Sequence, residues 1–84
     1  MKLITIKQAE QAIAMLQNFN AGNLRGQWVE GYERPEYIVY SYAEPIATQE
    51  GDSVEHRWIT EEKFSQTTSR HTAVVRRAWQ WTKR

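Results

Sequence analysis

The period of the apolar residues changes twice along the chain, which separates a first helix, an extended region and a second helix. At the start, apolar residues recur at three- and four-residue intervals, as on a helix with one buried face. Thr5 and Gln8 complete a capping box at the beginning of this pattern. We therefore expect a helix from Thr5 to Phe19, ended by a left-handed residue within positions 20–23. Its apolar face comprises Ile6, Ala9, Ile13, Leu16 and Phe19.

Residues 24–60 are rich in β-branched and aromatic residues, which is typical of strands. The clearest alternation covers residues 37–42, where one face holds Tyr37, Val39 and Ser41 and the other Ile38, Tyr40 and Tyr42. We expect one face to pack against a helix and the other to be open to a ligand. Pro45 predicts a turn, a bulge or an edge, because it donates no ladder hydrogen bond. Further strands are expected near Trp28, after Pro45 and over residues 54–60.

A second helical pattern follows three candidate N-caps, Thr67, Thr68 and Ser69. The apolar stripe of this helix comprises His71, Val74, Val75, Ala78 and Trp79. Together the elements predict a single α+β domain over residues 1–84. We expect a small antiparallel sheet of three or four strands, flanked by an N-terminal and a C-terminal helix.

The residue types that are absent or rare in the chain argue against several classes of catalytic site. The 84 residues include no cysteine, one aspartate (Asp52) and two histidines (His56 and His71). Thiol chemistry and convergent carboxylates are therefore not expected, and the histidine spacing indicates no shared catalytic site. The sequence also has no glycine-rich phosphate loop and no nucleophile elbow. We expect a protein that is not an enzyme and that holds no metal and no cofactor.

The overall balance of residues is that of a globular domain, with 40% hydrophobic and 25% charged residues. No apolar run reaches the roughly 18 residues of a membrane span. The first seven residues lack the continuous apolar region of a secretory signal. We therefore expect a cytoplasmic protein that does not enter a membrane.

Charge is distributed unevenly along the chain. Residues 1–62 hold all 10 acidic residues and 5 of the 11 basic ones, whereas residues 63–84 hold six basic residues and no acidic one. A basic segment of this kind indicates an anionic partner, or else it pairs with the acidic surface of the same protein. Charge alone leaves both interpretations open.

The segment from Thr67 to His71 is the strongest candidate binding site. A helix start exposes backbone N–H groups and the positive end of the helix dipole, and Arg70 adds a guanidinium suited to phosphate. The alternative is structural. In that case a hydroxyl caps the helix, Arg70 faces solvent, and His71 bonds to a neighbouring strand.

Two residues outside this segment complete the expected ligand site. Arg25 adds positive charge from a loop, and Tyr42 offers a ring that stacks on a base, as in proteins that hold nucleotides without a glycine loop. A chain of this length leaves little room for an enclosed pocket of ~300 Å³ or more. We therefore expect the ligand to sit at a subunit interface of a homo-oligomer.

Two motifs resemble a known group of proteins. Tyr40-Ser41-Tyr42-Ala43-Glu44-Pro45-Ile46-Ala47 and Phe64-Ser65-Gln66-Thr67-Thr68-Ser69-Arg70-His71, with Leu24-Arg25-Gly26 before them, are similar to a family of short uncharacterised proteins encoded by actinobacterial phages. This chain departs from the family pattern at Glu44, where Thr is usual, and at Phe64, where Tyr is usual. The resemblance implies a phage origin and a site of action in the cytoplasm of the infected cell. It carries no activity.

Three hypotheses for function follow. The first is a non-catalytic phage accessory protein that binds a nucleotide-like or phosphate-bearing anion, such as a counter-defence sponge for a nucleotide signal. The alternative is a protein–protein inhibitor of a host or defence factor that docks through exposed aromatic rings. The third is binding of duplex DNA through Arg76 and Arg77 of the basic second helix. The ligand site of the first hypothesis comprises Thr67, Thr68, Ser69, Arg70, His71, Arg25 and Tyr42.

Overall fold

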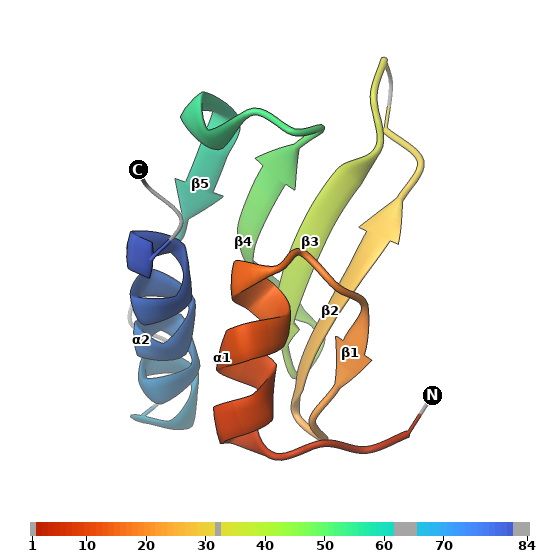
Figure 1. The fold of residues 1–84 in the computed structure, drawn as a ribbon. Helices are drawn as coiled ribbons and strands as arrows, with labels where there is room; N and C mark the ends of the chain where they lie inside the picture. Colours follow the sequence, from red (N-terminus) through yellow and green to blue (C-terminus); the bar gives the residue numbers. More distant parts are fainter. Residues whose placement is uncertain (1, 32, 62–65, 82–84) are drawn as a thin grey trace.

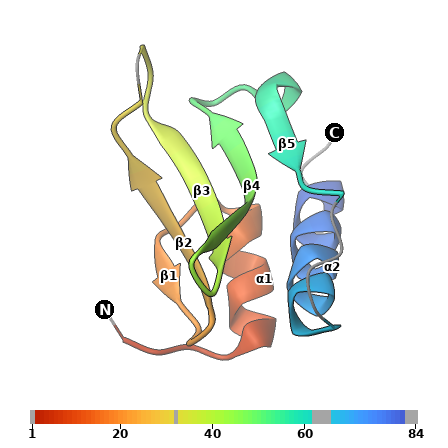
Figure 2. The ribbon, with the colours of Figure 1, turned by 180° about the vertical axis from the view of Figure 1, so that it is seen from behind.

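The computed structural model describes residues 2–31, 33–61 and 66–81 and folds them into two layers. One layer is an antiparallel sheet with the strand order β1-β2-β3-β4-β5, and the other is a pair of helices on one face of that sheet (Figure 1 and Figure 2). The elements in chain order are α1 (Ile6–Ala14), β1 (Phe19–Asn20), β2 (Leu24–Val29), β3 (Glu36–Ser41), β4 (Glu44–Glu50), the 3-10 turn η1 (Val54–His56), β5 (Arg57–Ile59) and α2 (Gln66–Trp81). Each strand pairs with the next one along the chain, so the sheet is a meander.

The α+β class and the two flanking helices agree with the sequence prediction, but the sheet has five strands rather than three or four. The strand that the prediction missed is β1. In β1, Phe19 pairs with Gly26 and Asn20 pairs with Arg25. The apolar period had assigned Phe19 to the first helix, and the turn signals had assigned Asn20 to the helix stop.

Helix α1 begins as expected and ends earlier than expected. The Gln8 N–H donates to the Thr5 hydroxyl at 3.1 Å and the Thr5 N–H donates to the Gln8 side chain at 2.9 Å, which confirms the capping box. The helix ends at Ala14, because Leu16 takes a left-handed conformation with φ 54°. The carbonyl of Leu16 accepts a 2.7 Å hydrogen bond from the indole of Trp28. A distant contact thus ends the helix, although the apolar period continues.

At two places the structure has a turn where the sequence predicted a helix stop or a strand. The residues expected to stop α1 form the β1–β2 turn, where Gly22 has φ 81° and its N–H donates to the Asn20 side chain at 3.0 Å. The strand expected over residues 54–60 is limited to β5. The first residues of the predicted strand form the 3-10 turn η1, in which the His56 N–H donates to the Ser53 carbonyl. Gly51, which precedes this turn, has φ 56°.

Strand β3 lies at the centre of the sheet and shows the expected alternation. The side chains that face the helices are buried, and those on the opposite face are half-buried; the first set is Tyr37, Val39 and Ser41, and the second is Glu36, Ile38 and Tyr40. The register with β4 shifts between Val39 and Tyr40, next to Pro45. The proline therefore coincides with an irregularity in the ladder, as predicted.

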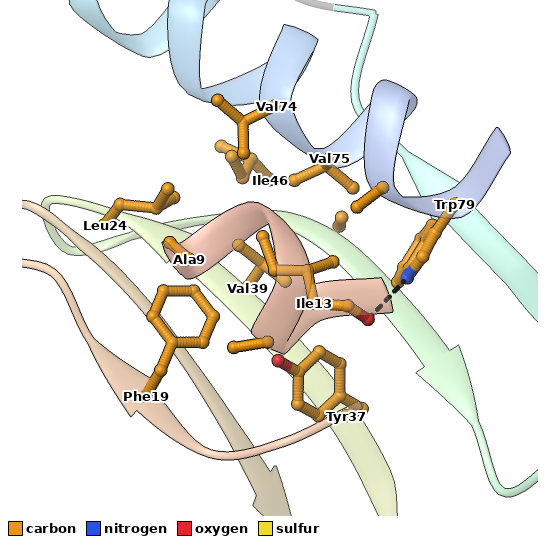
Figure 3. Close-up of a cluster of buried hydrophobic side chains, with 13 residues drawn as sticks. Ala9, Ile13, Phe19, Leu24, Tyr37, Val39, Ile46, Val74, Val75 and Trp79 are labelled. Carbon is orange, nitrogen blue, oxygen red and sulfur yellow. Dashed lines mark hydrogen bonds between the residues drawn. The ribbon is translucent and has the colours of Figure 1, made fainter. Parts of the chain in front are cut away.

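The core lies between the sheet and the two helices (Figure 3). Its fully buried aliphatic side chains come from both layers and include Ile13, Leu24, Val39, Ile46 and Val75. Two buried aromatic rings have satisfied polar groups: the Tyr37 hydroxyl donates to the Gln17 carbonyl at 2.7 Å, and the Trp79 indole donates to the Ile13 carbonyl at 3.3 Å. Burial raises the pKa of Tyr37 well above its ordinary value, so this hydroxyl stays protonated as a donor.

The directions of helices and strands give the molecule two different ends. The turn end holds the β1–β2 turn, the β3–β4 turn and the starts of both helices (Figure 1). The acidic end, opposite to it, holds the β2–β3 connection and the segment after β4, with Glu30, Glu33, Glu36, Glu50 and Asp52. Helix dipoles are positive at helix starts, so they polarise the molecule in the same sense as these carboxylates.

Gly26 is a position of close packing that leaves no space for a side chain. A Cβ at this position would overlap the ring of Phe19 and the hydroxyl of Tyr37. We expect Gly26→Ala to lower the free energy of unfolding by about 1–3 kcal/mol, because buried side chains must shift. Chemical denaturation followed by circular dichroism measures this change. Gln11→Ala, at an exposed position of α1, is the control. A Gly26→Ala variant as stable as the wild type would contradict the close packing.

Candidate functional site

The segment singled out from the sequence lies in the first turns of α2. The helix begins at Gln66, so Thr67, Thr68 and Ser69 are helical residues and do not precede the helix as N-caps. The position before the helix, residue 65, lies outside the described residues, as do residue 64 of the second motif and the basic residues 63, 83 and 84. Within the segment, Thr68 and His71 are buried, while Thr67, Ser69 and Arg70 are exposed.

The two buried members of the segment bond to the central strand. The Ser41 hydroxyl lies 3.0 Å from the Thr68 hydroxyl and 2.7 Å from Nδ1 of His71. Thr68 and His71 are three residues apart, so they share one face of α2, and Ser41 lies on the face of β3 that the helices cover. We call Ser41, Thr68 and His71 the serine–histidine cluster. This arrangement agrees with the structural interpretation of His71, in which the ring bonds to a neighbouring strand.

The cluster is neutral and sealed on its serine side. Ser41 is 1% exposed, so no substrate reaches its hydroxyl. Burial lowers the pKa of His71, so the ring is neutral near pH 7. Among the described residues, its other ring nitrogen, Nε2, makes no hydrogen bond and yet is not fully buried, since no fully buried side-chain nitrogen or oxygen is left unpaired there. His71 thus joins the core on one side and reaches the surface on the other.

Tyr42 follows Ser41 and stands at the surface beside the cluster. It has φ 58°, an unfavourable conformation for a tyrosine, and its N–H donates to the Asn23 carbonyl at 2.7 Å. This bond ties the β3–β4 turn to the β1–β2 turn. The ring is 49% exposed, and its centroid lies 6.3 Å from that of His71. Tyr42 is therefore an exposed ring on a fixed backbone.

Tyr42 and Arg25 line the same hollow at the turn end of the molecule. The hollow measures about 560 Å³, is wide open, and is lined on its other sides by Leu3, Asn20, Gly22, Asn23 and Ala43. The guanidinium of Arg25 lies 5.8 Å from the centre of the Tyr40 ring. Within the part of the chain that the structure describes, the guanidinium of Arg25 makes no hydrogen bond or ion pair. We call this hollow the turn-end hollow.

The structure thus divides the predicted site residues into three groups. Arg25 and Tyr42 share the turn-end hollow, and Tyr42 also neighbours His71. Thr68 points into the serine–histidine cluster. Thr67, Ser69 and Arg70 lie on the exposed part of the first turns of α2, without a described contact to the hollow.

Sequence reasoning missed three residues that shape this region. Ser41 alternates with buried Tyr37 and Val39, and a polar residue on a buried strand face signals a partner across the core. Asn20 and Asn23 had been assigned to a helix stop. In the structure they line the turn-end hollow, which no local pattern indicates.

A second hollow, of about 500 Å³, lies between β5 and α2. It is lined by Arg57 and Arg76, whose side chains contact other residues of the protein. The Arg57 guanidinium stacks 4.6 Å above the Trp79 ring, and its Nε donates to the Gln49 side chain at 2.5 Å. Burial lowers the pKa of Arg57 from its ordinary value. Arg76 donates to the Thr60 carbonyl at 3.4 Å. These contacts hold β5 and α2 together.

Two further properties concern metals and membranes. Across the described residues, no three histidine, cysteine, aspartate or glutamate side chains gather as a metal site. Neither helix, in the ranges that the structure covers, has the length and apolar character that crossing a membrane requires.

Removal of the Ser41 hydroxyl tests the serine–histidine cluster. Ser41→Ala leaves the buried Nδ1 of His71 and the Thr68 hydroxyl without their common partner. We expect the free energy of unfolding to fall by about 1–3 kcal/mol. Ser53→Ala, whose hydroxyl makes no capping bond at η1, is the matched control and should change it little. Equal stabilities of the two variants in chemical denaturation would contradict a structural role of the cluster.

Burial of His71 makes stability depend on pH. Because its pKa is lowered from the ordinary 6.5 in the folded state, the unfolded chain binds a proton that the folded chain does not. The contribution to stability is fully present above pH 6.5 and is lost as the pH falls from 6.5 through the folded pKa. We expect a lower melting temperature at about pH 5.5 than at about pH 7.5, and a smaller difference in His71→Gln. His56→Gln, at an exposed histidine, should keep the wild-type difference.

Comparison with known proteins places this arrangement in a family. A family model described as "Family of unknown function (DUF8033)" matches residues 1–78. No curated protein and no solved structure matches the chain. The matched residues include the whole sheet, the turn-end hollow and the serine–histidine cluster. The chain therefore belongs to the DUF8033 family of unknown function.

Proposed function

We propose that the protein is a non-catalytic binding protein for a nucleotide-like, phosphate-bearing anion, which it holds in the turn-end hollow. The observation that carries this proposal is the pairing of a guanidinium without a described polar partner, that of Arg25, with an exposed ring, that of Tyr42, in one hollow. The two sequence-predicted residues lie 17 positions apart in the chain and meet only through the folded turns.

The electrostatics of the turn end favour an anion. Both helices direct their starts, and hence the positive ends of their dipoles, toward this end (Figure 1). Arg70 is exposed on the first turns of α2, and among the described residues its side chain has no hydrogen bond or ion pair. Five of the ten acidic residues, which are Glu30, Glu33, Glu36, Glu50 and Asp52, lie at the opposite end. An approaching phosphate therefore meets the positive ends of two helix dipoles and the Arg25 and Arg70 guanidinium groups at the turn end.

The geometry of Tyr42 favours a flat group beside that phosphate. A ring held on a fixed turn loses little conformational freedom when a base stacks on it, and stacking contributes about 1–3 kcal/mol per base. The side-chain amides of Asn20 and Asn23 line the same hollow. Amides both donate and accept hydrogen bonds, so they suit the edge of a base.

Binding without turnover agrees with the way the candidate chemical groups are placed. The serine–histidine cluster resembles a nucleophile and base in its short hydrogen bond, but its serine is buried. The turn-end hollow is open to water, which a reaction centre commonly excludes. The resemblance to phage proteins adds the proposed context, an accessory or counter-defence protein that sequesters a nucleotide signal in the cytoplasm of an infected cell.

Binding of duplex DNA through α2 has less support from the described contacts. Arg77 forms a 2.9 Å ion pair with Glu10 of α1, and Arg76 bonds to the Thr60 carbonyl. A phosphate backbone would have to compete for both side chains. Docking on a host protein is the remaining alternative, and the ligand experiment below separates it from the proposal.

A nucleotide screen tests the proposed function. Native mass spectrometry of the purified protein, followed by thermal shifts with mono-, di- and cyclic nucleotides, should identify at least one stabilising ligand. We expect Arg25→Ala to weaken its affinity at least tenfold, about 1.4 kcal/mol. Tyr42→Asn should weaken it as well, while asparagine tolerates the left-handed backbone.

The matched control is Arg34→Ala, which removes an exposed arginine at the acidic end. It should leave the affinity unchanged. If no nucleotide shifts the melting temperature, or if Arg25→Ala and Arg34→Ala bind equally well, the hollow is not a nucleotide site. In that event a protein partner becomes the better hypothesis.

A further inference from the structure

The face of the sheet that the helices leave uncovered carries an ordered pattern of side chains. Register pairing places Ile38 beside Thr48 and Thr48 beside Trp58, so these three form one row across β3, β4 and β5. Gln27, paired with Ile38, extends this middle row onto β2. Neither α1 nor α2 covers the row (Figure 2).

The open face carries large apolar side chains within the middle row and next to it. The Trp58 side chain is 48% exposed, and Ile38 is only half-buried, although both are large apolar residues. Their neighbours Val29 and Tyr40 are also half-buried on this face. Large apolar side chains that gather on an uncovered sheet face are typical of a surface that another protein covers.

Charge differs between the two ends of this open face. Arg25 lies on one side of the middle row, toward the turn end, next to Tyr40. Glu36 and Glu50 are paired with each other on the other side, toward the acidic end. The face therefore has a cation at one end, two carboxylates at the other and apolar side chains between them.

We propose that the open face of the sheet is the interface of a homodimer, in which a second copy packs face to face with its strands running in the opposite direction. A two-fold axis along the middle row places that row against its own copy. It brings Arg25 of each subunit to the end of the face that carries Glu36 and Glu50 of the other. An isologous interface requires such self-complementarity.

Other occupants fit the charge pattern less well. A nucleic acid strand along the face would place its phosphates near Glu36 and Glu50, which repel them. A second copy with its strands in the same direction would oppose like charges at both ends. When the strands run in opposite directions, Arg25 of each copy meets carboxylates of the other at both ends. Twisted sheets stack face to face about 10 Å apart with strands nearly aligned.

This inference shares Arg25 with the proposed ligand site, but the two proposals are tested by different measurements. The dimer is measured without any nucleotide, and a monomer that binds a nucleotide would overturn the dimer while leaving the proposed function intact. Conversely, a dimer without nucleotide affinity would refute the ligand site alone.

Sedimentation velocity over a wide range of protein concentrations tests the dimer. We expect a mass twice that of the chain for the wild type. Thr48→Lys places a charge against its own copy at the centre of the interface, and Trp58→Ser removes the exposed ring; each should weaken the dimer at least tenfold. Met15→Ser, at a 59% exposed residue outside the sheet, is the control and should dimerise like the wild type. Circular dichroism verifies that each variant is folded.

A charge-swap pair tests the orientation. In a dimer of Arg25→Glu, like negative charges face each other at both ends. In a dimer of the double variant Glu36→Arg, Glu50→Arg, like positive charges face each other there. Each should be monomeric alone, and a mixture of the two should form heterodimers, since opposite charges then meet at both ends. A monomeric wild type at all concentrations would overturn the proposal. A dimer indifferent to Thr48→Lys and Trp58→Ser, or swap variants that fail to combine, would also overturn it.

Discussion

The hydroxyl of Ser41 is the contact on which the arrangement of this protein depends. It bonds to Thr68 and His71 on α2, and so fixes the C-terminal helix against the central strand of the sheet. Tyr42, the next residue, continues from this anchor into the β3–β4 turn and stands beside His71. One buried hydroxyl thus links the packing of the two layers with the exposed ring at the turn end.

The two-layer arrangement also determines which surfaces remain available. Because α1 and α2 both lie on one face of the sheet, the opposite face has no cover from the described chain (Figure 2). The helices also run in the same direction, so their starts gather at one end with two turns (Figure 1). The ligand site and the dimer interface that we propose are consequences of these two facts. They use different parts of the surface and meet only at Arg25.

Local signals in the sequence predicted the elements whose causes are local. The capping box at Thr5, the alternation in β3 and the irregularity near Pro45 each depend on residues close in the chain, and all were predicted. The early end of α1 was not, because the indole of Trp28 and the space beside Gly26 stabilise the departure of Leu16 and Phe19 from the helix. Such causes arise only after the sheet has formed.

For the candidate site as well, the sequence indicated residues but not the contacts that the fold creates between them. From the sequence, Arg25, Tyr42 and His71 were assigned to one ligand site. In the structure Tyr42 lines the turn-end hollow with Arg25, and its ring neighbours that of His71. Sequence reasoning placed the anion site at the start of α2, where two of the five residues turn inward. The sheet partner of those two residues, Ser41, is 30 positions from His71, a separation that no motif encodes.

The bond from the Trp79 indole to the Ile13 carbonyl joins residues that are 66 positions apart, and it has a consequence for the order of events during synthesis. The strands of a meander pair with their neighbours as they leave the ribosome, but the apolar faces of α1 and the sheet have no complete cover until α2 follows. The nascent chain therefore carries an exposed half-core until residue 79 is available. We therefore expect the core to be completed only after α2 has been synthesised, and ribosomal pausing before α2 to extend the period in which apolar side chains are exposed.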